Sequence, residues 1–556
     1  MKETKLHSLL RRLSHGSQHA VQNGSGLNEL DSYLHVERPV EKTIKEKMRR
    51  IQQNGGGLLL LVGSAGDGKS HLISTLKATG EFNDFEFRND ATEGCSPRMT
   101  AVETLRFTLD EFTDEKIVNT HHKLLVAINL GKLLDFIEDD IVREKFKTLV
   151  EIGNSINDES NNAAIIERPM IAVVSLVHQQ AFELNVDSNS TYPFKSHFMS
   201  SILDKITSPT INNPFYNAYL EDIGRLQEAN PLFINYTLLQ DKRVKESIIN
   251  LIIEAIIRFN LIVTPREFLS FIYSILVYPK LDEYKERTDF FSASLPTMLF
   301  NGSENKIQKA ISKLDPLKAS NLCHDKKLSE LYSNFKYNKK FLPEISIDLS
   351  TILEIKLNQF YNNHGDAKAI ISSYIFRINH LLSYHSESKS YINFITDLKG
   401  YFNKNEDIYV RLADLIVSSI PRHYGSYFSE SSFIPLNIQG SEYKLFAILE
   451  LPEPEFNPTF DKSIPYVFET SMLLTWNINQ DKIILKVDFD LYEHLYELNT
   501  GKLATAYEGE RNLSFSNFVR NISHHTSAQK EVKIVSHTHK VNTLVKRYTN
   551  LQIQQG

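Results

Sequence analysis

Short apolar runs alternate with helical periodicity in the first part of the chain. Residues 58–62 are continuously apolar, as in a strand buried on both faces of a sheet. Residues 40–53 have apolar side chains at helical spacing, and the glycine-rich stretch 54–57 ends that pattern. Further strands are predicted at 85–87, 124–128 and 170–174, with helices at 70–78 and 99–112. This alternation indicates an α/β fold with an open parallel sheet.

The pattern changes twice further along the chain. Helical periodicity dominates 231–284 and 349–420, whereas strands are predicted at 443–448 and 483–489 and a helix at 514–522. We therefore expect an all-α region and then a C-terminal α+β domain. The predicted divisions are an N-terminal helical segment (1–56), an α/β domain (57–230), a helical lid or partner domain (231–425) and the α+β domain (426–556).

Composition limits the classes of protein to consider. A chain of 556 residues is longer than one hydrophobic core usually organises, so several domains are expected. A composition of 41% hydrophobic and 23% charged residues is typical of a soluble globular protein. The net charge of -6 predicts no basic surface over the whole chain, so DNA contacts would be local or made through a partner. Two cysteines and the lack of an apolar run of about 18 residues favour a cytoplasmic protein without a membrane span.

The strongest motif is Gly63-Ser64-Ala65-Gly66-Asp67-Gly68-Lys69-Ser70, between a predicted strand and a predicted helix. This is the pattern of a P-loop (Walker A). Gly66 and Gly68 would let successive backbone N–H groups point at phosphate oxygens, at the positive end of the following helix. Lys69 would neutralise the β- and γ-phosphates, and the Ser70 hydroxyl would bind Mg²⁺. The motif predicts binding of a nucleoside triphosphate, ATP with Mg²⁺.

Hydrolysis also needs an acid near the metal, and the sequence leaves its identity open. The third predicted strand ends in Ile128-Asn129 rather than an acidic pair; Asn129 could orient water or sense the γ-phosphate, but it carries no charge. Asp90, after the second strand, is the candidate metal ligand and catalytic acid. The alternatives are Asp110 with Glu111, or no dedicated acid.

Two further residues are candidates for sensing the nucleotide. Ser175 ends the fourth predicted strand, either as a polar sensor or as an ordinary serine. Arg266, in Thr264-Pro265-Arg266 at the start of a helix, could contact the γ-phosphate of its own subunit or of a neighbour in an oligomer. The alternative is a surface arginine that pairs with Glu267 or Asp282.

Several segments resemble the DptF family of DNA phosphorothioation-dependent restriction proteins. They are Tyr33-Leu34-His35-Val36-Glu37-Arg38, the glycine-rich motif, Asn89-Asp90-Ala91-Thr92, Val126-Ala127-Ile128-Asn129-Leu130-Gly131, Asn213-Pro214-Phe215-Tyr216-Asn217-Ala218-Tyr219, Thr264-Pro265-Arg266-Glu267 and Val487-Asp488-Phe489-Asp490-Leu491-Tyr492. The resemblance implies a role in bacterial defence, with DptG-like and helicase-like DptH-like partners, in restricting DNA that lacks phosphorothioate. It also favours Asp90 as a residue of the nucleotide site.

The expected role is thus that of an ATP-binding subunit that hydrolyses ATP slowly, and not of the nuclease itself. A nucleotide-gated scaffold or sensor with little turnover is the first alternative. A signalling P-loop ATPase unrelated to restriction is the second.

Overall fold

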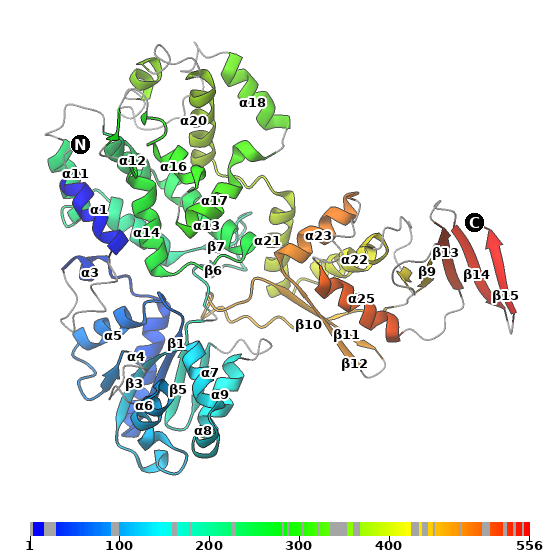
Figure 1. Cartoon of the computed structure of the whole chain (residues 1–556), viewed down its shortest axis with the longest axis horizontal. Helices are drawn as coiled ribbons and strands as arrows, with labels where there is room; N and C mark the ends of the chain where they lie inside the picture. The colour runs from blue at the N-terminus through cyan, green and yellow to red at the C-terminus, as the bar shows by residue number, and fades with distance from the viewer. Residues whose placement is uncertain are drawn as a thin grey trace. The chain divides into compact units, whose positions relative to one another are not determined.

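The structure is a computed structural model that divides into two compact units (Figure 1). Unit 1 comprises Met1–Glu183, Phe194–Glu387 and Ser463–Phe468, and unit 2 comprises Leu184–Pro193, Ser388–Lys462 and Glu469–Gly556. The residues that the structure describes are 4–15, 29–89, 99–157, 164–177, 179–223, 230–280, 283–285, 289–302, 305–319, 322–333, 353–359, 367–423, 433–435, 443–448, 451–478, 481–502, 512–525, 531–536, 541–547 and 550–555.

A five-stranded sheet organises the first part of unit 1, in the order β2-β3-β1-β5-β4. The strands are β1 (Gly57–Gly63), β2 (Glu86–Arg88), β3 (Lys123–Asn129), β4 (Ile165–Arg168) and β5 (Ile171–Ser175). The central strand β1 pairs in parallel with β3 and β5, and β2 pairs in parallel with β3. The edge strand β4 is antiparallel, so the sheet is mixed rather than wholly parallel as predicted. Met170, predicted to open the fourth strand, lies in the turn between β4 and β5 with φ 64°.

Strand β1 is apolar throughout because different helices cover its two faces. Leu58, Leu60 and Val62 pack in one cluster with side chains of α6–α9. Leu59 and Leu61 pack in a second cluster with α4 and α5. Full burial of each such side chain contributes about 1.5–3 kcal/mol, which holds β1 in the middle of the sheet. These helices are α4 (Pro39–Asn54), α5 (Lys69–Ala78), α6 (Ala101–Thr108), α7 (Leu130–Glu138), α8 (Asp140–Lys145) and α9 (Lys147–Asn157).

The remainder of unit 1 is mainly helical. Every described element between residues 231 and 382 is a helix, as the periodicity predicted for 231–284 and from 349 onward. Besides the short β6 (Glu183–Leu184) and β7 (Phe194–Lys195), the elements are α1 (Lys5–His15), α3 (Glu29–Leu34), α10 (His197–Thr207), α11 (Pro214–Ile223), α12 (Pro231–Gln240), α13 (Lys242–Phe259), α14 (Pro265–Leu276), α16 (Leu295–Asn301), α17 (Lys306–Ile311), α18 (Leu322–Ser333) and α20 (Ala367–Leu382). Short 3₁₀ turns are η1 (Asp110–Phe112), η2 (Ile117–Asn119), η4 (Ser312–Leu314) and η5 (Pro316–Lys318).

Unit 2 contains a separate region of antiparallel sheet, in agreement with the strands predicted near the C-terminus. One sheet has the order β10-β11-β12 and the other β15-β14-β13-β9-β8. Trp476 is fully buried in β11, and its ring lies 4.9 Å from that of Phe518 in α25. The elements are α21 (Lys389–Phe402), α22 (Glu406–His423), β8 (Phe433–Pro435), β9 (Tyr443–Ile448), β10 (Glu455–Phe456), β11 (Met472–Ile478), β12 (Asp481–Val487), α23 (Phe489–Asn499), α25 (Leu513–His525), β13 (Glu531–Ser536), β14 (Val541–Arg547) and β15 (Asn550–Gln555).

Two elements begin or end at residues other than those predicted, and capping residues lie at both places. The helix expected at 99–112 ends at Thr108, and it starts after the capping box that Thr100 forms with Glu103. The strand expected to run to Phe489 ends at Val487, because the Asp488 side chain accepts a hydrogen bond from the Leu491 N–H and thereby starts α23. The predicted domain divisions stay a prediction.

None of the described helices combines the length and the apolar character needed to cross a membrane.

Candidate functional site

The segment of residues 63–70, here called the glycine-rich turn, joins the carboxyl end of β1 to the amino end of α5. Gly66 has φ +92° and Gly68 has φ +85°, conformations that residues with a Cβ rarely adopt. Gly68 is also the N-cap residue of α5 and makes no side-chain cap. The first N–H groups of a helix have no acceptor within it, so the turn presents backbone donors at the positive end of α5.

Two segments that are distant in sequence contact the turn at its glycines. A Cβ at Gly66 would lie 3.1 Å from Oγ1 of Thr264, the N-cap residue of α14. A Cβ at Gly68 would lie 3.1 Å from a guanidinium nitrogen of Arg38, which precedes α4. The start of α14 and the residues ahead of α4 therefore both pack directly on the turn.

The charged side chains of the turn bind its own backbone. Lys69 Nζ donates to the Ser64 carbonyl at 2.7 Å, and the Ser64 N–H donates to the Asp67 carboxylate. Arg38 Nη1 donates to the Asp67 carbonyl at 2.9 Å. Burial raises the pKa of Asp67 above its usual value, although the Ser64 N–H, Lys69 and Arg38 oppose the rise. The Asp67 carboxylate therefore accepts a hydrogen bond from one of the backbone N–H groups that could otherwise bind an anion in this turn.

Asn129 and Ser175 lie on either side of the turn, as expected from the ends of their strands. Asn129 pairs with Gly63, and Ser175 pairs with Val62. The Asn129 side chain is exposed, and its Oδ1 accepts from the Gly131 N–H at 3.1 Å to cap α7. Ser175 is buried, and its Oγ accepts from a main-chain N–H two residues on at 3.3 Å. Both polar residues thus have local structural roles beside the turn.

Arg266 lies in the first turn of α14, two residues after the N-cap that touches Gly66. Its side chain is exposed. Among the described residues, the alternative ion pair with Glu267 does not form. Glu267 instead caps α14 together with Thr264 and pairs with Lys306 at 3.2 Å. Asp282, the other expected partner, lies outside the described residues.

The structure excludes one alternative for the metal-binding acid. Asp110 pairs with Lys116, and Glu111 lies 3.5 Å from Nδ1 of His122, which immediately precedes β3. These acids are therefore at the amino end of β3, whereas the turn is at the carboxyl end, roughly 20 Å along a strand of this length. The alternative of Asp110 with Glu111 is wrong. Asp90, the candidate metal-binding acid, lies outside the described residues.

A partly buried polar network that the sequence did not reveal adjoins the turn. His71 follows Ser70, and its Nε2 lies 3.0 Å from Nδ1 of His35. His35 Nε2 lies 3.2 Å from the buried Glu41 carboxylate, which Lys45 approaches at 2.8 Å. Burial lowers the pKa of His71 to about 4, so its ring is neutral at neutral pH. The i,i+4 spacing of Glu41 and Lys45 was the only local signal for this network.

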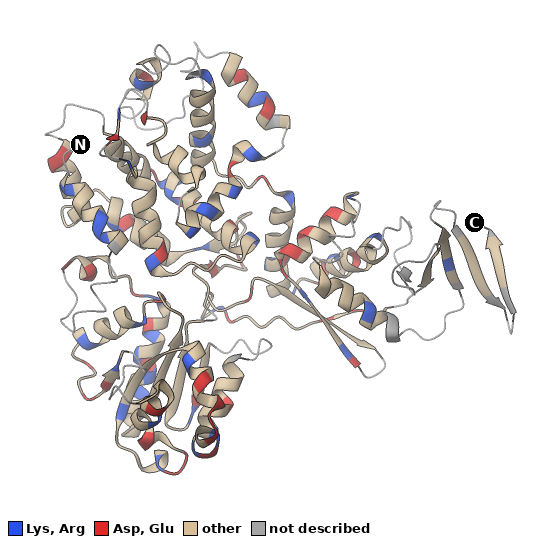
Figure 2. Cartoon of the chain, in the orientation of Figure 1, with Lys and Arg blue, Asp and Glu red and all other residues tan. Residues whose placement is uncertain are grey.

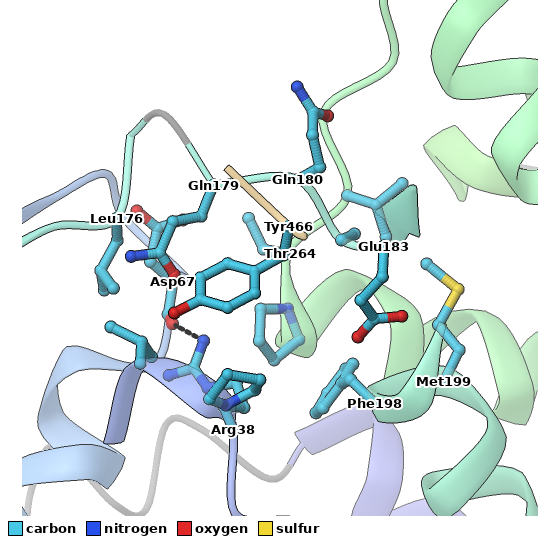
Figure 3. Close-up of a pocket in the computed structure, with 15 residues that line it drawn as sticks. Arg38, Asp67, Leu176, Gln179, Gln180, Glu183, Phe198, Met199, Thr264 and Tyr466 are labelled. Atoms are coloured by element: carbon cyan, nitrogen blue, oxygen red, sulfur yellow. Dashed lines mark hydrogen bonds between the residues drawn. The ribbon is translucent and has the colours of Figure 1, made fainter. Parts of the chain in front are cut away.

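A cavity opens beside the turn within unit 1. Its volume is about 100 Å³, several times what one water molecule needs. Both apolar and polar side chains line it, among them Arg38, Asp67, Glu183, Phe198, Thr264 and Tyr466. Figure 3 shows the Tyr466 ring in the middle of this group, with Arg38 and Asp67 joined by a hydrogen bond. Tyr466 comes from a segment far along the chain, and no sequence motif indicated it.

Metal ligation by the described residues is limited. They contain no group of three or more His, Cys, Asp and Glu side chains able to hold a metal ion. Ser70, in the first turn of α5, offers a neutral oxygen that suits Mg²⁺ as one ligand beside a phosphate chain. Basic and acidic side chains are interspersed along the described helices rather than separated by sign (Figure 2).

Comparison of the chain with known protein families, with curated proteins and with solved structures found no match. What the site can bind therefore follows from its own chemistry. Backbone donors, a lysine and a hydroxyl at a helix start suit a chain of phosphates.

Proposed function

We propose that the chain binds ATP with Mg²⁺ through a P-loop formed by residues 63–70. The observation that carries the proposal is the pair of glycines with positive φ, Gly66 and Gly68, directly ahead of Lys69 and Ser70 at the start of α5. In this proposal Lys69 exchanges the Ser64 carbonyl for the β- and γ-phosphates, and the Ser70 hydroxyl binds Mg²⁺.

The proposed activity is slow ATP hydrolysis by a subunit of a complex that restricts DNA lacking phosphorothioate. The resemblance of segments along the chain to the DptF family supports this role, with DptG-like and DptH-like subunits as partners. A net charge of -6 fits a subunit whose DNA contacts are few or shared. Asp90 is the proposed metal-binding acid, and Arg266 is the proposed γ-phosphate contact, in cis or in trans.

A nucleotide-gated scaffold is the second candidate, and Asn129 favours it. This residue stands beside Gly63, where an acid would support hydrolysis. It is neutral, and its side-chain oxygen caps α7. A site built in this way would hold ATP and turn it over seldom.

Calorimetric titration of the Lys69→Ala variant with ATP and Mg²⁺ tests the binding proposal. A charge-assisted hydrogen bond contributes about 1.5–3 kcal/mol, so we expect affinity to fall roughly 10- to 100-fold or more. Lys116→Ala removes a lysine that pairs with Asp110 at the other end of the strands, and this variant should bind ATP as the unchanged chain does. Unchanged binding by Lys69→Ala would show that the P-loop assignment is wrong.

Turnover distinguishes the two candidate functions. ATP hydrolysis is measured for the chain alone, and then with its partner subunits and DNA with or without phosphorothioate. Stimulation by unmodified DNA, lost in Lys69→Ala, supports the restriction ATPase. Tight binding without turnover supports the scaffold. If deletion of the chain from cells with unmodified DNA leaves their DNA damage unchanged, the restriction role is wrong.

A further inference from the structure

We infer that the cavity beside the glycine-rich turn receives the nucleobase and ribose of the bound nucleotide, and that the Tyr466 ring contacts the base. This inference rests on the proposed function and adds a specificity-determining residue to it.

The position of the cavity fits one end of a nucleotide. Asp67 belongs to the turn itself and also lines the cavity, and Thr264 lies against Gly66 and lines it as well. Arg38 donates to the Asp67 carbonyl and also lines the cavity, so it contacts both the turn and the cavity. A ligand whose phosphates occupy the turn would therefore have its other end in the cavity.

The chemistry of the walls suits a flat aromatic ring with polar edges. Phe198 and Met199 supply apolar surface, whereas Gln179 and Glu183 supply hydrogen-bonding groups (Figure 3). Val263 adds a further apolar side chain. A metal ion or a free phosphate gains nothing from apolar walls, but a base binds more tightly when it stacks on an aromatic ring. The walls therefore favour a nucleoside over an inorganic anion.

Tyr466 is held in place by its own short segment, residues 463–468. This segment belongs to unit 1, although the residues before and after it in sequence belong to unit 2. The Gln180 N–H donates to the Tyr466 carbonyl at 2.8 Å, and the Gln180 side chain donates to the Phe468 carbonyl at 3.1 Å. Val467 forms a β-bridge with Gln179. These contacts fix the backbone so that one side chain reaches the cavity.

We expect the aromatic ring of Tyr466, rather than its hydroxyl, to contact the base. Its side chain is buried, and burial raises the pKa of Tyr466, although a hydrogen bond with the Thr43 side chain opposes the rise. The phenol is therefore neutral and its hydroxyl already has a partner on α4. A base in the cavity would meet the ring face, so phenylalanine should replace tyrosine and alanine should not.

Binding of two ligands by the full chain tests the inference. We expect Tyr466→Ala to weaken binding of ATP with Mg²⁺ roughly 5- to 100-fold and to leave the affinity for inorganic tripolyphosphate unchanged. Tyr466→Phe should bind both ligands as the unchanged chain does. Tyr332→Ala, which removes an exposed tyrosine of unit 1, is the matched control.

The outcomes separate the inference from the proposed function. Lys69→Ala should weaken both ligands, because both carry phosphates. If Tyr466→Ala weakens both ligands equally, or neither, the base site is wrong while the P-loop stands. If the unchanged chain binds neither ligand, both proposals fail.

Cross-linking gives a second measurement that does not depend on how the variant folds. Irradiation of the unchanged chain with 8-azido-ATP should label the peptide that contains residues 463–468, and excess ATP should prevent the labelling. ATP-sensitive labelling confined to other peptides would overturn the inference.

Discussion

Asp67 is the acidic residue of the glycine-rich turn, and its charge opposes that of the proposed ligand. Burial raises its pKa in the folded chain, so the folded state holds this proton more tightly than the unfolded state does. The stability that Asp67 contributes is present below its unfolded pKa and is lost as the pH rises through its folded pKa. At neutral pH the ionised carboxylate therefore costs stability, and it also repels phosphate.

The Asp67→Asn variant should bind inorganic tripolyphosphate several-fold more tightly at neutral pH. The amide oxygen can still accept the Ser64 N–H, so the turn keeps its conformation while the negative charge is removed. Its thermal stability should also exceed that of the unchanged chain at neutral pH, and the difference should shrink in acid, where Asp67 itself is protonated.

Asp110→Asn is the control for this substitution. It removes an exposed carboxylate at the other end of the strands. Calorimetry on both variants decides the matter: equal gains in affinity would mean that overall charge, and not Asp67 in particular, opposes the ligand.

At the scale of elements, the start of α14 packs directly on the glycine-rich turn and restricts which residues the turn can contain. Gly66 has the positive φ of +92° that the turn requires, and an added Cβ there would lie only 3.1 Å from Thr264 Oγ1, so Thr264 would have to shift. The capping box that starts α14 fixes Thr264 at this position. The turn and α14, which are distant in sequence, thus pack closely because Gly66 has no Cβ.

Gly66→Ala should destabilise the chain by about 1–2 kcal/mol and reduce ATP affinity by at least tenfold, from backbone strain together with this contact. Gly80→Ala offers a matched control, because Gly80 has φ +68° but no atom within 4 Å of an added Cβ. It should cost a similar amount of stability and leave ATP binding intact. Denaturant unfolding and calorimetry measure the two effects; an equal loss of affinity in Gly80→Ala would contradict the contact argument.

At the scale of the whole molecule, we expect the stability of unit 1 to depend on two histidines and to fall in acid. Burial lowers the pKa of His71 to about 4, and nearby His35 and Arg38 add to the effect. Burial also lowers the pKa of His380 to about 4, with a smaller effect from His324. Each ring folds neutral, so its contribution to stability is present above the unfolded pKa of about 6.5 and is lost as the pH falls towards 4.

Unfolding free energies should therefore fall between about pH 6.5 and pH 4, by on the order of 2–3 kcal/mol for each histidine. His71→Gln and His380→Gln should each flatten this dependence, whereas His121→Gln, at an exposed residue, should not. Denaturant titrations across this pH range provide the measurement. A slope that stays the same in both variants would show that other groups cause the acid sensitivity.

The local patterns of the sequence were sufficient for the contiguous features. The apolar run of β1 predicted a strand buried on both faces, and the helical spacing ahead of it predicted α4. The glycine-rich turn, with Asn129 and Ser175 on the strands beside it, followed from strand ends meeting at one edge of a parallel sheet. Each of these depends on residues close in sequence or on the period of a single element.

Only the tertiary structure decided what surrounds the turn. Arg38, Thr264 and Tyr466 come from three distant segments, and no period or spacing relates them to Gly66 or Gly68. The antiparallel edge strand β4 and the distance of Asp110 from the turn likewise depend on how strands pair. The sequence therefore determined the glycine-rich turn, whereas long-range packing determined the residues around it, because contacts between distant segments leave no local pattern in the sequence of any one segment.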